Sequence, residues 1–89
     1  MSIERPEVGD IVKSTKGRDE GTIYVVYMTS EDYAFCVNGK HRSMSNPKKK
    51  KFKHISSLKI SDELAKKFKE HQKVLDSDIR KTIDNLNIV

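Results

Sequence analysis

The sequence is poor in the residues that brace small secreted domains and in those that build large cores. Its 89 residues include one cysteine, no tryptophan, two prolines and only six aromatic residues. A single cysteine, Cys36, excludes an internal disulfide and is consistent with a reducing compartment, so we expect a cytoplasmic protein. With 35% hydrophobic residues, the chain is expected to form a thin core without a deep substrate pocket.

Long apolar runs and catalytic motifs are also missing. No apolar run approaches about 18 residues and the N-terminus lacks an apolar segment, so we expect neither a signal peptide nor a membrane span. The residues Cys36, His41, His54 and His71 do not follow the spacing of zinc ligands. There is no phosphate-binding glycine loop and no nucleophile elbow. We therefore expect no enzymatic activity, no metal and no cofactor.

Acidic residues are absent from residues 40–54, although cations are abundant there. This acid-free block contains Lys40, Arg42, Lys48, Lys49, Lys50, Lys51 and Lys53. Residues 1–60 hold 12 Lys/Arg and 7 Asp/Glu, whereas residues 61–89 hold 6 of each, so the first part carries the net charge of +5. Such a block attracts polyanions, and its alternative is a solvated loop that only aids solubility.

Short runs rich in Val, Ile, Tyr and Phe, separated by Gly, Asn, Ser and Pro, are typical of a small, mainly β barrel or sandwich. The five expected strands are Val8–Lys13, Thr22–Met28, Tyr33–Val37, His41–Ser45 and Phe52–Ile55. Asn38 and Gly39 predict a two-residue hairpin turn, because both tolerate positive φ. Pro47 favours an exposed connection at the start of the lysine run.

Helical signals begin at Ser61, which can cap a first helix with Leu64 and Phe68 on one face. A second helix is predicted from Asp76 or Ser77, with an apolar stripe of Ile79, Ile83 and Leu86. We therefore expect a barrel over residues 1–60 and two short helices over residues 61–89. The stripes are too narrow for a core of their own, so the helices either pack on the barrel, which we favour, or dock on a partner.

The first predicted hairpin combines glycines with cations. Gly17 and Gly21 permit a sharp turn and the close approach of a phosphate, and Lys13, Lys16 and Arg18 supply charge at the same end. The arginine can bind phosphate, contact a guanine edge or stack on an unpaired base. In the alternative interpretation, the glycines only permit the turn, Asp19 bonds its own backbone, and the arginine pairs with a nearby carboxylate.

The aromatic residues favour packing over ligand binding. Tyr24, Tyr27, Tyr33 and Phe35 could form a stacking platform for bases, but strand aromatics are more often core residues. Phe52 lies inside the lysine run, where we expect it to anchor the last strand, with base stacking as the alternative.

The sequence around the first hairpin resembles a known motif. Gly9-Asp10-Ile11-Val12, followed by Gly17, Gly21 and Val26, is similar to the KOW motif of SH3-like barrels. With Gly17-Arg18-Asp19, Asn38-Gly39 and the run from Asn46 to His54, residues 6–60 resemble bacterial KOW RNA-binding proteins related to the L-fourteen-e class of large-subunit ribosomal proteins. The resemblance implies an SH3-like barrel, RNA or ribosome binding and no catalysis. Glu20 departs from the usual pattern, and the C-terminal helices lie outside it.

These observations predict an RNA-binding protein that contacts ribosomal RNA of the large subunit, with ribosomal proteins as further candidate partners and no membrane contact. The candidate RNA-binding residues are Lys13, Lys16, Gly17, Arg18, Lys40, Arg42, Lys48, Lys49, Lys50, Lys51 and Lys53. The alternative is a protein-interaction adaptor that uses the barrel or the stripe of the second helix. The sequence does not identify the RNA or distinguish permanent from conditional binding.

Overall fold

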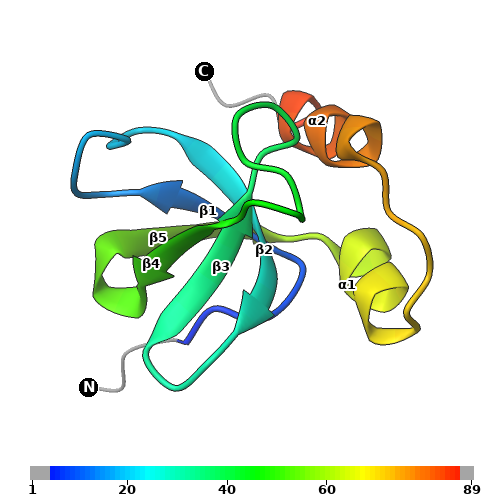
Figure 1. Ribbon diagram of the computed structural model, residues 1–89, viewed down its shortest axis with the longest axis horizontal. Helices are drawn as coiled ribbons and strands as arrows, with labels where there is room; N and C mark the ends of the chain where they lie inside the picture. Colours follow the sequence, from blue (N-terminus) through cyan, green and yellow to red (C-terminus); the bar gives the residue numbers. More distant parts are fainter. Residues whose placement is uncertain (1–4, 87–89) are drawn as a thin grey trace.

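A computed structural model describes residues 5–86. It contains one antiparallel sheet of five strands in the order β4-β3-β2-β1-β5, followed by two helices (Figure 1). The elements are β1 (Asp10–Ser14), β2 (Ile23–Thr29), β3 (Tyr33–Val37), β4 (Lys48–Lys51), a 3₁₀ turn η1 (Phe52–His54), β5 (Ile55–Ile60), α1 (Asp62–Lys69) and α2 (Asp76–Asp84). The predicted mainly β fold with two C-terminal helices is confirmed. Within residues 5–86, β4 and β5 do not pair with each other, so the sheet is not closed.

The first three strands lie where the sequence predicts them, whereas the fourth does not. The predicted strand His41–Ser45 belongs to a long β3–β4 loop, and the lysine run itself forms β4. The amide oxygen of Asn38 accepts hydrogen bonds from the backbone N–H groups of Lys40 and Arg42, at 2.9 and 3.0 Å. Gly39 has a positive φ but Asn38 does not, so the predicted two-residue turn does not form.

The lysine run forms a strand because all four lysines from Lys48 to Lys51 pair in register with β3. Lys48 pairs with Cys36 and Lys50 with Ala34. A lysine-rich strand at the edge of a sheet also discourages pairing with another chain. The predicted connection is therefore confined to Asn46 and Pro47, and the lysines themselves do not belong to it. The predicted strand Phe52–Ile55 was wrong, because its first three residues form η1 and β5 continues to Ile60.

Successive strand residues point to opposite faces of the sheet, and each face has its own core. One cluster consists of Val12, Tyr24, Val26, Ala34 and Cys36, against which Phe52 and Ile55 pack. The other joins the sheet to the helices and consists of Ile11, Val25, Val37, Leu64, Val74 and Ile79. Residues 61–86 are therefore packed on the sheet, and both helices lie on one side of it (Figure 1).

The helices begin at the predicted residues. Ser61 caps α1 by accepting a hydrogen bond from the Leu64 N–H at 3.4 Å. At the start of α2, the Asp78 carboxylate accepts from the Leu75 N–H at 3.0 Å. Ile79 is fully buried, and Ile83 and Leu86 pack against the same cluster, so the predicted stripe faces the sheet. Neither helix described in residues 5–86 is long and apolar enough to cross a membrane.

Two glycines let the helices approach the sheet closely. Gly9 has φ +94°, and a Cβ there would lie 2.5 Å from the Cβ of Ala65 in α1. Gly39 in the β3–β4 loop has φ +74°, and a Cβ there would meet the backbone carbonyl of Asp76 in α2. The Arg80 side chain also donates a hydrogen bond to the Gly39 carbonyl. The second helix thus holds the first turn of the β3–β4 loop.

Candidate nucleic-acid interface

The β1–β2 loop, residues 15–22, is fixed to the sheet by a carboxylate. Asp19 accepts hydrogen bonds from Ser14 Oγ at 2.9 Å and from Tyr24 OH at 2.7 Å. The Lys50 Nζ lies 2.9 Å from Asp19 Oδ1 and donates to the Lys16 carbonyl at 2.8 Å. This polar network therefore connects the loop with the strands β1, β2 and β4. Asp19 does not serve as a local turn cap, and Arg18 is not its ion-pair partner.

The network keeps Asp19 ionised. Burial alone would raise the pKa of this carboxyl, but the hydrogen bonds from Tyr24, Lys50 and Ser14 and the charge of Lys50 lower the pKa to about 2. Burial and the bond to Asp19 together raise the pKa of the Tyr24 hydroxyl. The phenol therefore stays protonated and remains a donor to the carboxylate at physiological pH.

Lys50 is only 7% exposed, and its ammonium group is bound to Asp19 and Lys16. The sequence predicts it as a phosphate ligand, but its position is that of a structural ion pair. Its charge still contributes to the local potential, although the Asp19 carboxylate opposes that contribution. The sequence did not show this pairing because Asp19 and Lys50 are far apart along the chain.

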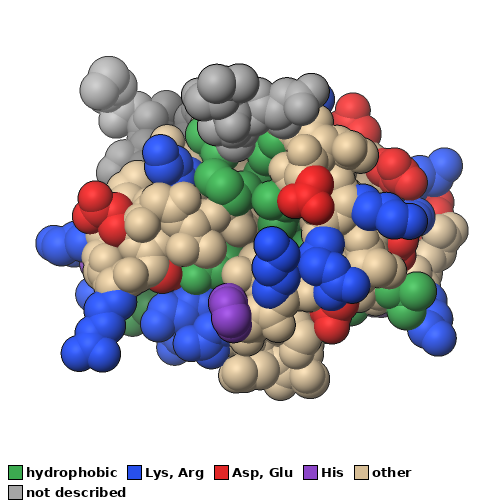
Figure 2. All heavy atoms as spheres, turned by 90° about the horizontal axis from the view of Figure 1, so that it is seen from above, with side chains coloured by type: hydrophobic (Ala, Val, Ile, Leu, Met, Phe, Trp, Pro, Cys, Tyr) green, Lys and Arg blue, Asp and Glu red, His purple; other side chains and the backbone are tan. Residues whose placement is uncertain are grey.

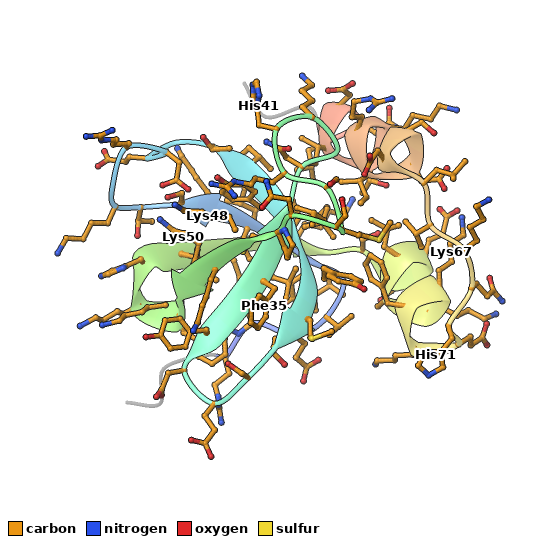
Figure 3. All side chains as sticks on the ribbon, viewed as in Figure 1. Phe35, His41, Lys48, Lys50, Lys67 and His71 are labelled. Atoms are coloured by element: carbon orange, nitrogen blue, oxygen red, sulfur yellow. The ribbon has the colours of Figure 1, made fainter. Side chains whose placement is uncertain are left out.

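An open cleft of about 450 Å³ lies between the β1–β2 loop and the β3–β4 loop. Among the predicted residues, Gly17, Arg18, Arg42, Lys48 and Lys50 line it. Figure 3 shows Lys48 and Lys50 on β4 below the β1–β2 loop, and His41 at the tip of the β3–β4 loop. Of these cations, Arg18 is exposed and Arg42 and Lys48 are half-buried. We refer to this feature as the basic cleft.

His41 also lines the basic cleft and was not predicted as a site residue. Arg42 is oriented by Asn46, whose amide oxygen lies 3.4 Å from its guanidinium. Both His41 and Arg42 reach the cleft because their loop turns back on the end of β3, where the Asn38 and Gly39 N–H groups donate to the Arg42 carbonyl at 2.9 and 3.1 Å. The position of His41 was missed in the sequence because residues His41–Ser45 were predicted as a strand rather than as part of this loop.

The lysines of β4 are divided between two sides of the sheet. Lys48 and Lys50 face the basic cleft, whereas Lys49 and Lys51 alternate to the opposite side. There the Lys49 Nζ lies 4.2 Å from the centroid of the Tyr33 ring. Lys51 lines a separate hollow of about 800 Å³ together with Lys53. The lysine run is therefore not one continuous patch.

Three other predicted residues lie outside the basic cleft. Lys13 is exposed on β1, on the face opposite Ser14 and the polar network. Lys40 is exposed and lines a hollow beside Arg80 of α2. Lys16 is exposed in the β1–β2 loop, where only its carbonyl contacts Lys50.

The 3₁₀ turn adds a histidine surrounded by positive charge. The Thr15 N–H donates to the His54 carbonyl at 2.9 Å, which places the turn beside the β1–β2 loop. Partial desolvation and the charges of Lys16, Lys53, Lys50 and Lys51 lower the pKa of His54. The positive potential of the lysine run therefore extends to η1.

The charge distribution differs between the sheet and the helices. In Figure 2, Lys and Arg side chains gather at the lower left, on the sheet side, whereas acidic and basic side chains mix over the helices at the right. Residues 61–89 contain equal numbers of acidic and basic residues. The sheet side therefore offers the stronger attraction for a polyanion.

Two further observations concern metal binding and cysteine chemistry in the part of the chain that the structure describes. No group of three or more His, Cys, Asp or Glu side chains there could hold a metal ion. The Cys36 thiol is fully buried, and burial raises its pKa to about 12, so it remains protonated.

Comparison of the chain with models of protein families and with curated proteins gives no match.

Proposed function

We propose that this protein is a KOW-type, SH3-like RNA-binding protein that docks on structured RNA through the basic cleft. The observation that carries the proposal is the convergence of Arg18, Arg42 and Lys48 from three different segments on one open cleft. Arginine and lysine side chains are the usual donors to phosphate oxygens, and such contacts fix the position of a protein on a nucleic acid. Gly17, with φ +96°, lies at the rim of the cleft, where the absence of a side chain allows the close approach of a phosphate.

The strand order supports the proposal that the fold is an SH3-like barrel. The strand order β4-β3-β2-β1-β5, with a 3₁₀ turn between the two edge strands, is similar to that of SH3-like barrels. The glycines and cations of the first hairpin resemble the KOW motif, which is associated with ribosomal RNA. We therefore propose ribosomal RNA of the large subunit as the ligand, the cytoplasm as the location, and adjacent ribosomal proteins as possible neighbours.

The proposed binding is electrostatic, so its salt dependence is the test. If about four to six phosphates are neutralised, a plot of log Kd against log salt concentration should be linear with a slope of about 3 to 6. The measurement uses a structured fragment of large-subunit ribosomal RNA and an unrelated duplex. A slope near zero would contradict phosphate recognition.

The adaptor alternative predicted contact through the barrel or through the stripe of the second helix. The stripe of Ile79, Ile83 and Leu86 packs against the core cluster, which favours the sheet as the contact surface. Leu58 and Ile60 on the edge strand β5 are 42% and 62% exposed, and they are the apolar residues that favour a protein contact. Ribosome association that is insensitive to salt and lost on Leu58→Ser and Ile60→Ser would support this alternative.

A further inference from the structure

A second surface lies on the side of β4 opposite the basic cleft. It is a hollow of about 800 Å³ between the β2–β3 turn, the end of β4 and η1. Two aromatic residues, Tyr33 and Phe52, line it together with three cations, Arg5, Lys51 and Lys53. We call it the aromatic hollow. Both rings are half-buried, so part of each remains accessible from the hollow.

Cations already lie over both rings. The Lys49 Nζ is 4.2 Å from the Tyr33 centroid, and the Arg5 guanidinium carbon is 5.2 Å from the Phe52 centroid. These distances place one cation on a face of each ring, as in a cation–π contact, so an entering base would take the place of that cation. Arg5 is exposed and donates a hydrogen bond to the Glu31 carbonyl, and its planar guanidinium can stack on the far face of an entering base. The exposed Lys49 side chain can move away from the Tyr33 ring.

The walls of the hollow are held in place by the fold. Tyr33 begins β3 and pairs with Lys51. The Phe52 N–H donates to the Asp32 carbonyl at 3.1 Å, and the Phe52 ring packs against the core of Val12, Tyr24, Val26, Ala34 and Cys36. The two rings are therefore presented on rigid elements.

The charges of the hollow are segregated. Lys51 and Lys53 lie on the side of β4 and η1, whereas Glu31 and Asp32 lie at the β2–β3 turn. A purely anionic ligand would be repelled at the acidic rim. A nucleotide suits both rims, because its phosphate is anionic and its base presents N–H donors that carboxylates accept.

We propose that the aromatic hollow binds one unpaired base of an RNA strand, stacked on Tyr33 or Phe52, with the adjoining phosphates on Lys51 and Lys53. This inference rests on the proposed RNA binding and adds to it a preference for RNA that contains an unpaired base. RNA-binding proteins recognise unpaired bases by stacking them on aromatic side chains and arginine planes. The basic cleft and the aromatic hollow lie on opposite sides of one short strand, so a single folded RNA with a bulge or loop could contact both.

The test compares two RNA hairpins with the same stem sequence. In one, a single 2-aminopurine is extruded as a bulge, and in the other it is paired within the stem. We expect the full-length protein to bind the bulged hairpin about fivefold or more tightly, since stacking of one base contributes about that much or more. We also expect binding to quench the fluorescence of the extruded base, and Tyr33→Leu and Phe52→Leu to reduce both effects.

Lys48→Gln provides the matched control, because Lys48 lines the basic cleft and is the first residue of the same strand. It should weaken both hairpins by the same factor and leave the preference intact. Equal binding of both hairpins by the wild type would overturn the base-binding inference while leaving RNA binding supported. A preference that survives both folded aromatic variants would overturn it too, and binding of neither hairpin at low salt would overturn the inference and the proposed function together.

Discussion

At the scale of single residues, Asp19 shows how one carboxylate can organise a binding loop. It holds Ser14, Tyr24 and Lys50 around the base of the β1–β2 loop. The sequence offered two roles for Asp19, a turn cap and a partner of Arg18, and neither is observed. The ion pair with Lys50 depends on the register of β3 with β4, which sequence spacing does not reveal.

We predict that Asp19→Asn changes the dependence of stability on pH. The folded-state pKa of Asp19 is lowered to about 2, so its contribution to stability is present above the unfolded-state pKa and is lost as the pH falls from about 4 to 2. The variant should be less stable by up to about 2 kcal/mol at pH 7, because the buried Lys50 loses its counter-charge. Urea unfolding at pH 7, 4 and 2.5 measures this. An equal difference between the two proteins at every pH would contradict it.

His54 provides a second prediction at this scale, because partial desolvation and the nearby lysines lower its pKa in the free protein. Bound phosphates would offset the charges of Lys16 and Lys53 and favour the protonated imidazole, so the pKa of His54 should rise when RNA binds. NMR titration of the imidazole with and without RNA measures the change, with the exposed His71 near α1 as an internal control. Identical shifts at both histidines would indicate a nonspecific effect.

At the scale of elements, α2 supports the loop that carries part of the basic cleft. Gly39 packs against the backbone of Asp76, and the Arg80 side chain donates to the Gly39 carbonyl. Arg42 follows three residues later in the same loop and lines the cleft. The helix can therefore influence the proposed RNA binding through the position of this loop.

We predict that Arg80→Met weakens RNA binding severalfold more than Lys81→Met. Both changes remove one positive charge from α2, but Lys81 is exposed and only Arg80 holds the β3–β4 loop. The comparison uses RNA affinity at fixed salt, with thermal melts to confirm that both variants fold. Equal losses of affinity would mean that Arg80 acts through its charge alone.

The elements also show what sequence patterns can and cannot predict. Ser61, the acidic first turn and the stripe of Ile79 and Ile83 predicted the helices correctly, because capping and helical periodicity are local signals. The strand formed by Lys48–Lys51 was missed, because its composition resembles a loop and its stability comes from pairing with β3. The division of the lysines between two surfaces follows from that strand and was missed for the same reason.

At the scale of the whole molecule, the helices and the sheet form one packed unit. Leu64 and Ile79 are 2% and 0% exposed and share a cluster with Ile11, Val25 and Val37. The sequence correctly favoured packing of the helices on the sheet. It could not show that they complete one of its two cores, because the contacts join residues distant in sequence.

We predict that ending the chain at Ile60 abolishes cooperative unfolding or makes the protein aggregate. The truncation would expose Ile11, Val25 and Val37, which share a core cluster with Leu64, Val74 and Ile79 of the removed segment. Circular dichroism during thermal unfolding, with sedimentation to detect aggregation, measures the outcome. A truncated chain that melts cooperatively at the wild-type temperature would show that residues 61–86 are not needed for the core.

The basic cleft is the central claim for the whole molecule, and salt dependence with matched charge variants tests it most directly. Arg18→Ala combined with Lys48→Ala removes two charges from the cleft, and Lys66→Ala combined with Lys73→Ala removes two exposed charges from the helical region. We predict that the cleft variant reduces the slope of log Kd against log salt by about two, since each lost phosphate contact reduces it by about one. The helical variant should keep the wild-type slope, and equal slopes for the two variants would contradict RNA binding through the cleft.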